Sequence, residues 1–129
     1  MDKRREAKIR TALIERREHI QGELDRLQEE IRALGVAQGI EHGALSNHMA
    51  DDGSNVWEQE RILTMSNDLQ DMLNQAHGAL ERLDHGTYGD CERCGRPVNP
   101  ERLEAFPWVR YCIECQTIVE REQNMPVRQ

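Results

Sequence analysis

Two stretches of the chain repeat apolar residues at the spacing of a helical packing stripe. Over residues 3–34 the repeat is seven residues, and a second apolar position lies between most of its members. Such a heptad pattern predicts one long helix whose apolar stripe packs against another helix. The apolar positions of this stripe are Leu13, Ile20, Leu24, Leu27, Ile31 and Leu34.

The second apolar stripe follows a run of turn-forming residues. The sequence Asp-Asp-Gly-Ser-Asn at 51–55 predicts a turn, after which Ser54 or Asn55 is expected to cap a helix. Apolar residues then recur in steps of three and four until Gly86, which can end that helix. They are Ile62, Met65, Leu69, Met72, Ala76, Ala79 and Leu83.

Two matched helices joined by a glycine-containing connection predict an antiparallel coiled-coil hairpin. Each helix has about 30 residues, which corresponds to roughly 45 Å at about 1.5 Å per residue. A parallel dimer through the first helix is the structural alternative, although the matched lengths and the turn argue against it. We therefore expect a mostly α chain with a long hairpin over residues 1–87 and an acidic tip near residues 49–55.

The four cysteines of the chain form two pairs, Cys91-x-x-Cys94 and Cys112-x-x-Cys115. A two-residue spacer lets both sulfurs of a turn reach one ion, and two such turns complete a tetrahedron of thiolates. The spacing therefore predicts one structural Zn²⁺ ion. Redox C-x-x-C motifs are one alternative, but they require a βαβ context; disulfides are the other, but they belong in secreted chains.

The cysteines define a second predicted domain, a small C4 zinc-finger module over residues 88–129. Prolines mark turns within it, short strands are expected at 96–98 and 109–111, and a short C-terminal helix is expected at 113–123. Four larger side chains are expected to pack around the metal site. They are Tyr88, Leu103, Phe106 and Trp108.

Composition and charge narrow the range of functions. The chain is 32% charged and has a net charge of −7, and residues 35–90 hold ten acidic but only two basic residues. Without clustered cations, no direct sequence-specific DNA binding is expected. The sequence has no apolar run long enough for a membrane span, no secretory signal and no nucleophile–base pair. These features predict a cytoplasmic protein that is not an enzyme.

Residues 79–115 read ALERLDHGTYGDCERCGRPVNPERLEAFPWVRYCIEC and resemble the DksA/TraR-type RNA polymerase-binding regulators. The likeness extends upstream through Glu-Gln-Glu at 58–60 to the turn at Asp51. It implies that the cysteines hold a structural zinc. It also implies a coiled-coil arm that inserts its acidic tip into the secondary channel of RNA polymerase and alters initiation.

The resemblance also assigns the polymerase-facing tip. The tip motif of the family is Asp-x-Ala, and the matching positions here are Asp51, Asp52 and Gly53. Gly53 departs from the motif because it lacks the methyl group of alanine. Some members of the family act together with ppGpp, which makes this nucleotide a candidate partner. The alternative function is a zinc-stabilised coiled-coil adaptor or dimerisation protein without polymerase binding.

Overall fold

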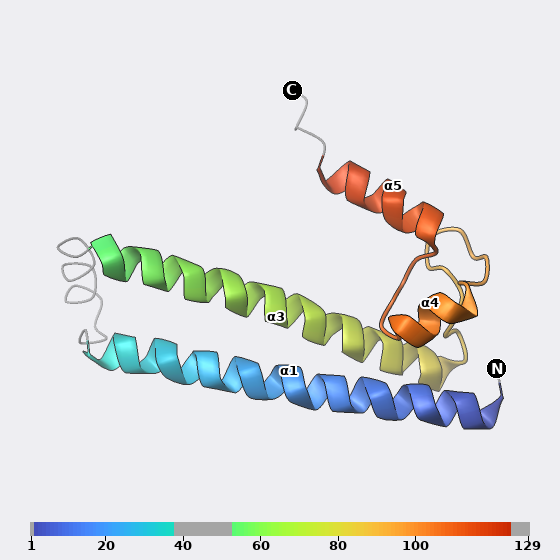
Figure 1. Cartoon of the computed structure of the whole chain (residues 1–129), viewed down its shortest axis with the longest axis horizontal. Helices are drawn as coiled ribbons and strands as arrows, with labels where there is room; N and C mark the ends of the chain where they lie inside the picture. The colour runs from blue at the N-terminus through green and yellow to red at the C-terminus, as the bar shows by residue number, and fades with distance from the viewer. Residues whose placement is uncertain (1, 38–52, 125–129) are drawn as a thin grey trace. The chain divides into compact units, whose positions relative to one another are not determined.

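Four α-helices make up the regular structure of residues 2–37 and 53–124, which are the residues that the computed structural model describes (Figure 1). They are α1 (Lys3–Ala37), α3 (Gly53–His85), α4 (Pro100–Ala105) and α5 (Ile113–Gln123). None of these helices combines the length and the hydrophobicity needed to cross a bilayer. The mostly helical fold expected from the sequence is confirmed.

The chain divides into two compact units, one formed by Met1–Arg16 and Gln75–Gln129 and the other by Arg17–Asn74. In each unit α1 runs antiparallel to α3 and shares a buried cluster with it (Figure 1). The cluster of the first unit is Ile9, Leu13, Ala79, Leu80 and Leu83. The cluster of the second is Ile20, Leu24 and Leu73. The predicted antiparallel hairpin is therefore confirmed, whereas the predicted domain boundary after residue 87 stays a prediction.

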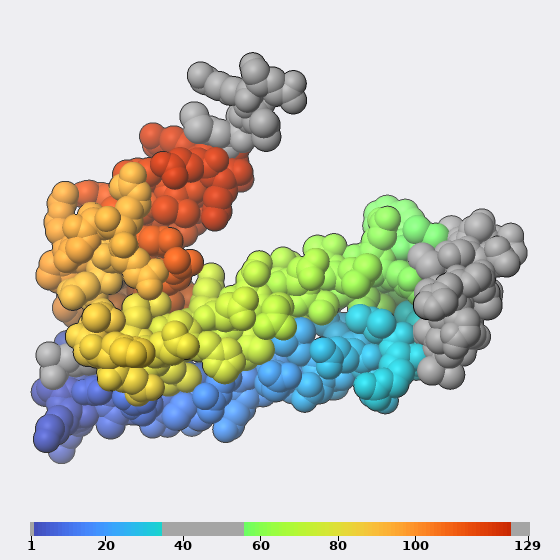
Figure 2. Space-filling view, turned by 180° about the vertical axis from the view of Figure 1, so that it is seen from behind, coloured from blue at the N-terminus to red at the C-terminus, as the bar shows by residue number. Residues whose placement is uncertain are grey.

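In the first unit the end of α3 lies directly on the N-terminal part of α1, as the yellow and blue atoms of Figure 2 show. Leu13 is fully buried here, and in the second unit Ile20 is only 1% exposed. Burying a side chain of this size stabilises a fold by about 1.5–3 kcal/mol. These two residues of the heptad repeat therefore contribute directly to the pairing of the helices.

The stripe predicted for the first helix is correct in its middle and wrong at one position. Leu24 and Leu27 are buried as predicted, but Ile31 is 37% exposed. Ile9, which the sequence reasoning left out, is buried at the base of the hairpin. Ile9 precedes Leu13 by four residues, so it continues the same helical face one turn toward the N-terminus.

The stripe predicted for the second helix is confirmed at the buried positions 62, 76, 79 and 83 and is wrong at one position. Leu73 and Leu80 are buried, whereas the predicted Met65 is 43% exposed. The buried positions of α3 are 62, 73, 76, 79, 80 and 83. The buried face is therefore wider than the predicted stripe and takes in the neighbouring positions 73 and 80. In place of the exposed Met65, the half-buried Ser66 lies on this face, and its polar side chain gave no signal in the sequence.

The start of α3 differs from the prediction, whereas its end confirms the prediction. The helix begins at Gly53, so Ser54 and Asn55 lie within it and do not cap it. It ends at His85, and Gly86 adopts a φ of 73°, the left-handed conformation that a glycine accepts without strain. Of the predicted tip, Asp51 and Asp52 lie outside the described residues.

The zinc-finger module contains one helix that was not predicted and lacks the two strands that were. Among the described residues only a single antiparallel bridge, between Asp90 and Pro97, replaces the expected strands. The helix α4 begins after Asn99, whose side chain accepts a hydrogen bond from the Glu101 amide at 2.9 Å. Asn followed by Pro at the first helical position is a recognisable start signal. The predicted helix at 113–123 is confirmed as α5.

Candidate metal centre

The sulfur atoms of the four cysteines form a single cluster. All four lie within 4.8 Å of one another, and the sulfurs of Cys94 and Cys112 are 3.9 Å apart. In a tetrahedral site with Zn–S bonds of about 2.3 Å, neighbouring sulfurs are about 3.8 Å apart. The donor type, number and spacing therefore fit one Zn²⁺ ion.

The first cysteine turn is closed by backbone hydrogen bonds. The amide of Cys91 donates to the carbonyl of Arg96 at 2.8 Å, and the amide of Gly95 donates to the carbonyl of Cys91 at 2.9 Å. Gly95 has a φ of 78°, which a residue with a β-carbon adopts only with strain. This turn directs the amide of Cys94 toward the sulfur of Cys91, at 3.5 Å.

The second cysteine turn is the N-terminus of α5. Cys112 caps the helix, and its sulfur accepts a hydrogen bond from the amide of Cys115 at 3.4 Å. Amides at a helix N-terminus lack partners within the helix and carry partial positive charge, so they stabilise a thiolate. The helix therefore positions two ligands and supports the charge of one of them.

The four sulfurs differ in their environment. Cys91 and Cys115 are buried, at 3% and 4% exposed, and pack with Val98 and Leu103, whereas Cys94 is exposed. Four thiolates complete the coordination of zinc and leave no position for water or substrate. The arrangement therefore fits a structural site that holds the module together.

Without the charge of a metal ion, the surrounding protein groups favour the thiolate form of Cys91 and disfavour that of Cys115. Burial would raise the pKa of Cys91, but backbone hydrogen bonds from its neighbours outweigh burial and lower that pKa to about 6. Burial raises the pKa of Cys115 to about 12, although the side chain of Arg93 acts in the opposite direction. A zinc ion binds all four as thiolates because its positive charge compensates their mutual repulsion.

Arg82 of α3 connects the hairpin to both halves of the zinc-finger module. Its guanidinium, with a side chain only 11% exposed, pairs with Glu92 at 3.1 Å and donates to the carbonyl of Val109 at 3.2 Å. Glu92 also pairs with Arg110 at 2.7 Å, and this hydrogen bond raises the pKa of Arg110. Because Glu92 lies in the first cysteine turn and Val109 precedes the second, one arginine fixes both segments.

Tyr88 packs against the metal cluster and against the hairpin cluster of the first unit. Its hydroxyl donates to the carbonyl of Pro107 at 2.8 Å. Burial, the largest effect, raises the pKa of Tyr88 to about 12, although Arg82 and Arg5 oppose it. The tyrosine therefore joins the base of the hairpin to the segment that leads into the second cysteine turn.

Of the side chains expected around the metal, Trp108 and Phe106 lie elsewhere. Leu103 is 6% exposed within the metal cluster, as predicted. Trp108 instead packs on the hairpin cluster beneath Arg16, whose guanidinium carbon is 3.5 Å from the ring centroid. Phe106 is 47% exposed and meets the edge of Trp108 at 5.8 Å between centroids. The cation–π contact contributes about 0.5–2 kcal/mol. The Nε atom of the same arginine is buried and has no hydrogen-bond partner among the described residues.

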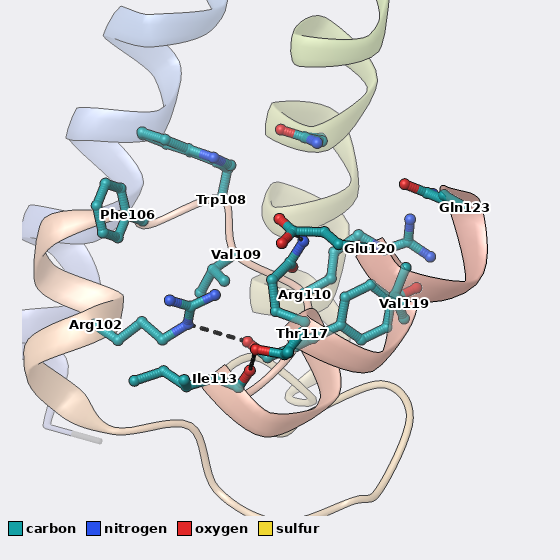
Figure 3. Close-up of a pocket in the computed structure, with 13 residues that line it drawn as sticks. Arg102, Phe106, Trp108, Val109, Arg110, Ile113, Thr117, Val119, Glu120 and Gln123 are labelled. Carbon is teal, nitrogen blue, oxygen red and sulfur yellow. Dashed lines mark hydrogen bonds between the residues drawn. The ribbon is translucent and has the colours of Figure 1, made fainter. Parts of the chain in front are cut away.

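A cavity of about 560 Å³ lies beside the module, between α5 and the segment around Trp108 (Figure 3). Arg102 donates from its Nε to the carbonyl of Tyr111 at 3.2 Å, and Arg110 is paired with Glu92. Glu120 adds a negative charge to the lining. The cavity is therefore balanced in charge and carries no concentrated anion site.

The sequence located the cysteine cluster but missed the residues that support it. Three arginines support the module: Arg93 contacts Cys115, Arg82 contacts Glu92, and Arg16 contacts Trp108. No local pattern indicated these three arginines, because each partner lies at least ten positions away in the sequence. The tip residues Asp51 and Asp52 lie outside the described residues, so their position relative to Gly53 stays a prediction.

Comparisons with known proteins agree with this geometry. Residues 86–121, which include all four cysteines, match the prokaryotic dksA/traR C4-type zinc finger. The chain is 34% identical over 101 residues to general stress protein 16O of Bacillus subtilis, covering 78% of this chain and 62% of that protein. It is 30% identical over 89 residues to the RNA polymerase-binding transcription factor DksA of Escherichia coli, covering 60% of this chain and 59% of that protein. The matched segments thus span less than two thirds of these curated relatives.

A solved structure extends the likeness to nearly the whole chain. The transcription factor DksA2 from Pseudomonas aeruginosa matches with a TM-score of 0.73 and 25% identity, over 97% of this chain and 90% of that one. The zinc-finger match and the cysteine cluster together support one structural zinc ion. With its coiled-coil hairpin and C4 zinc finger, the chain is similar to proteins of the DksA/TraR family, whose C4-type zinc finger its residues 86–121 match.

Proposed function

We propose that this chain is a DksA-type transcription regulator that binds RNA polymerase. The observation that carries the proposal is the likeness to DksA2, a transcription factor, over 97% of the chain at a TM-score of 0.73. It is supported by the 30% identity to a relative named as RNA polymerase-binding. A regulator of this kind acts by contact with the polymerase and not by a reaction of its own.

The finer part of the proposal concerns where the chain contacts the enzyme. We infer that the connection between α1 and α3 enters the secondary channel, with Asp51, Asp52 and Gly53 facing the polymerase. In support, α1 and α3 have 35 and 33 residues, so each extends roughly 50 Å at about 1.5 Å per residue. A helix pair of this length can carry a small acidic turn into a narrow passage.

The zinc-finger module has a separate role in this proposal. Cys91, Cys94, Cys112 and Cys115 hold the zinc, and the metal keeps the module folded at the base of the hairpin. The contacts of Arg82 and Tyr88 connect that module to α3 and α1. A role for ppGpp stays a prediction from the resemblance, because no described residue was assigned to the nucleotide. A cytoplasmic location stays a prediction from the sequence features.

In vitro transcription with a tip variant tests the proposed mechanism. The double variant Asp51→Asn/Asp52→Asn removes two charges with little change in side-chain volume, so we expect it to keep polymerase binding and lose the effect on initiation. Asp68→Asn/Asp71→Asn is the matched control, because these two aspartates are exposed on α3 and away from the tip. If the tip variant regulates transcription as the unmodified chain does, the secondary-channel mechanism is wrong.

The alternative is an adaptor or dimerisation protein, and exposed apolar side chains on α3 are the observation in its favour. Trp57 is 76% exposed, Leu63 54% and Met65 43%. Leu63 and Met65 are two positions apart, so they point about 160° apart around the helix and do not form one stripe. This weakens the case for a second coiled-coil interface. Light scattering that gives a dimer, together with no polymerase binding, would favour the adaptor.

A further inference from the structure

Cys115 is the buried sulfur of the cluster that receives no hydrogen bond from a backbone amide among the described residues. The sulfurs of Cys91 and Cys112 each accept one from the amide three positions later, at 3.5 and 3.4 Å. Cys94 is exposed, so water can reach its sulfur. Cys115 is only 4% exposed. A thiolate at this position needs a donor from elsewhere in the protein.

Arg93 provides that donor. Its guanidinium Nη1 is 3.8 Å from the sulfur of Cys115, at hydrogen-bonding distance for sulfur. Arg93 lies in the first cysteine turn, whereas Cys115 belongs to the second, twenty-two positions later. The contact with Cys115 is the largest cause of the raised pKa of Arg93, and the carboxylate of Glu122 on α5 adds to it. One side chain therefore links the two halves of the site.

The charge of the site gives this contact an energetic role. Four thiolates around one Zn²⁺ carry a net charge of −2, and two of the sulfurs are buried. Burying uncompensated charge is costly, and donors to the ligand atoms reduce that cost. Residues that hydrogen-bond to metal ligands typically change metal affinity by about 10–100-fold when they are removed.

We propose that Arg93 is a positioning residue for the zinc site, which retains the metal by donating a hydrogen bond from the first cysteine turn to the thiolate of Cys115. The proposal uses only residues of this chain and the structural zinc of its zinc finger. It assigns a role to a side chain that the spacing of the cysteines does not indicate. Because Arg93 is otherwise exposed, its removal leaves the packed core of the module unchanged.

Zinc release to a chromophoric chelator tests the proposal with the full zinc-loaded chain. We expect Arg93→Gln to release zinc about 10-fold faster or more, because the Cys115 thiolate loses both its donor and the nearby positive charge. Arg93→Lys keeps the positive charge but lacks the planar guanidinium, so its rate of zinc release should lie between those of the unmodified chain and Arg93→Gln. The pH at which protons displace half of the zinc should also rise in Arg93→Gln, since a less stabilised thiolate is protonated more readily.

Arg96→Gln is the matched control, because it removes the same charge from the same module. The backbone carbonyl of Arg96 closes the first turn, but its side chain donates to none of the four sulfurs in the described structure. We expect this control to release zinc at the unmodified rate. Equal release rates for Arg93→Gln and Arg96→Gln would overturn the proposal. Reconstitution with Co²⁺ shows whether each variant keeps four thiolate ligands, which we expect of Arg93→Gln because the guanidinium supports a ligand and is not one itself.

Discussion

Replacing Tyr88 with phenylalanine isolates a single hydrogen bond between the hairpin base and the zinc-finger module. The ring remains, so the packing of Tyr88 against both clusters is kept. The lost bond is the one from the hydroxyl to the carbonyl of Pro107, at 2.8 Å. A hydrogen bond of this kind contributes about 1 kcal/mol, and the unpaired carbonyl adds a cost where water cannot reach it. We expect Tyr88→Phe to lower the free energy of unfolding by about 1–2 kcal/mol.

Urea unfolding of the zinc-loaded protein at neutral pH measures this difference. The matched control is Tyr111→Phe, because the hydroxyl of Tyr111 forms no hydrogen bond to another described residue whereas that of Tyr88 does. We expect this control to change the free energy of unfolding by less than about 0.5 kcal/mol. If both variants behave alike, the contact with Pro107 does not stabilise the fold.

The same pair of proteins gives a prediction for the dependence on pH. The pKa of Tyr88 is raised from 10.0 to about 12, so the unfolded chain loses the phenolic proton at a lower pH than the folded chain does. The stabilising contribution is fully present below pH 10.0 and is lost as the pH rises toward about 12. The unmodified chain should therefore approach the stability of Tyr88→Phe across this interval. A difference that stays constant would show that folding does not raise the pKa of Tyr88.

Two further predictions test the buried face of α3 and the metal. Leu73→Ala should lower the free energy of unfolding by about 2–5 kcal/mol because Leu73 is 5% exposed, whereas Met65→Ala, at 43% exposed, should change it by less than about 1 kcal/mol. Urea unfolding of both variants tests whether Leu73, and not Met65, lies on the buried face of α3. Removal of zinc with a chelator should lower the melting temperature and abolish the near-ultraviolet dichroism of Trp108, because the metal holds the segment that packs this ring on the hairpin. An unchanged melting temperature would contradict a structural role for the zinc.

The features predicted correctly from the sequence are those defined by short-range spacing. The two C-x-x-C pairs placed Cys91 and Cys112 at the same metal site, and the run after Cys112 indicated α5. The heptads of the first helix indicated the hairpin because the residues on one face recur every three or four positions. In these cases one local rule determines which side chains lie together.

The buried face of α3 is wider than the predicted stripe because two neighbouring heptad patterns are partly buried together. Both patterns include position 62 and every seventh position after it; at the remaining positions the face takes in Ala79 from the predicted pattern and Leu73 and Leu80 from its neighbour. The exposed Met65 fits the apolar pattern of the sequence, whereas the half-buried Ser66 does not. Only the packing against α1 determines which of two neighbouring positions is covered.

The supporting contacts of the zinc-finger module could not be predicted because their partners are distant in sequence. Arg16 and Trp108 are ninety-two positions apart, and their contact depends on how the chain folds back on the hairpin. Arg93 looks like any exposed charge until Cys115 is placed beside it. The cap at Asn99 is different, since Asn before Pro is a local signal that the sequence reasoning read only as a turn.

The measurement that tests the central claim most directly is equilibrium binding of the zinc-loaded chain to core RNA polymerase at moderate salt. We predict saturable binding of micromolar affinity or tighter, which a molecule that occupies the secondary channel displaces. Binding that such a competitor leaves unchanged would place the contact elsewhere on the enzyme. Absence of binding, with zinc and helical structure intact, would contradict the account and leave the adaptor as the better description of this chain.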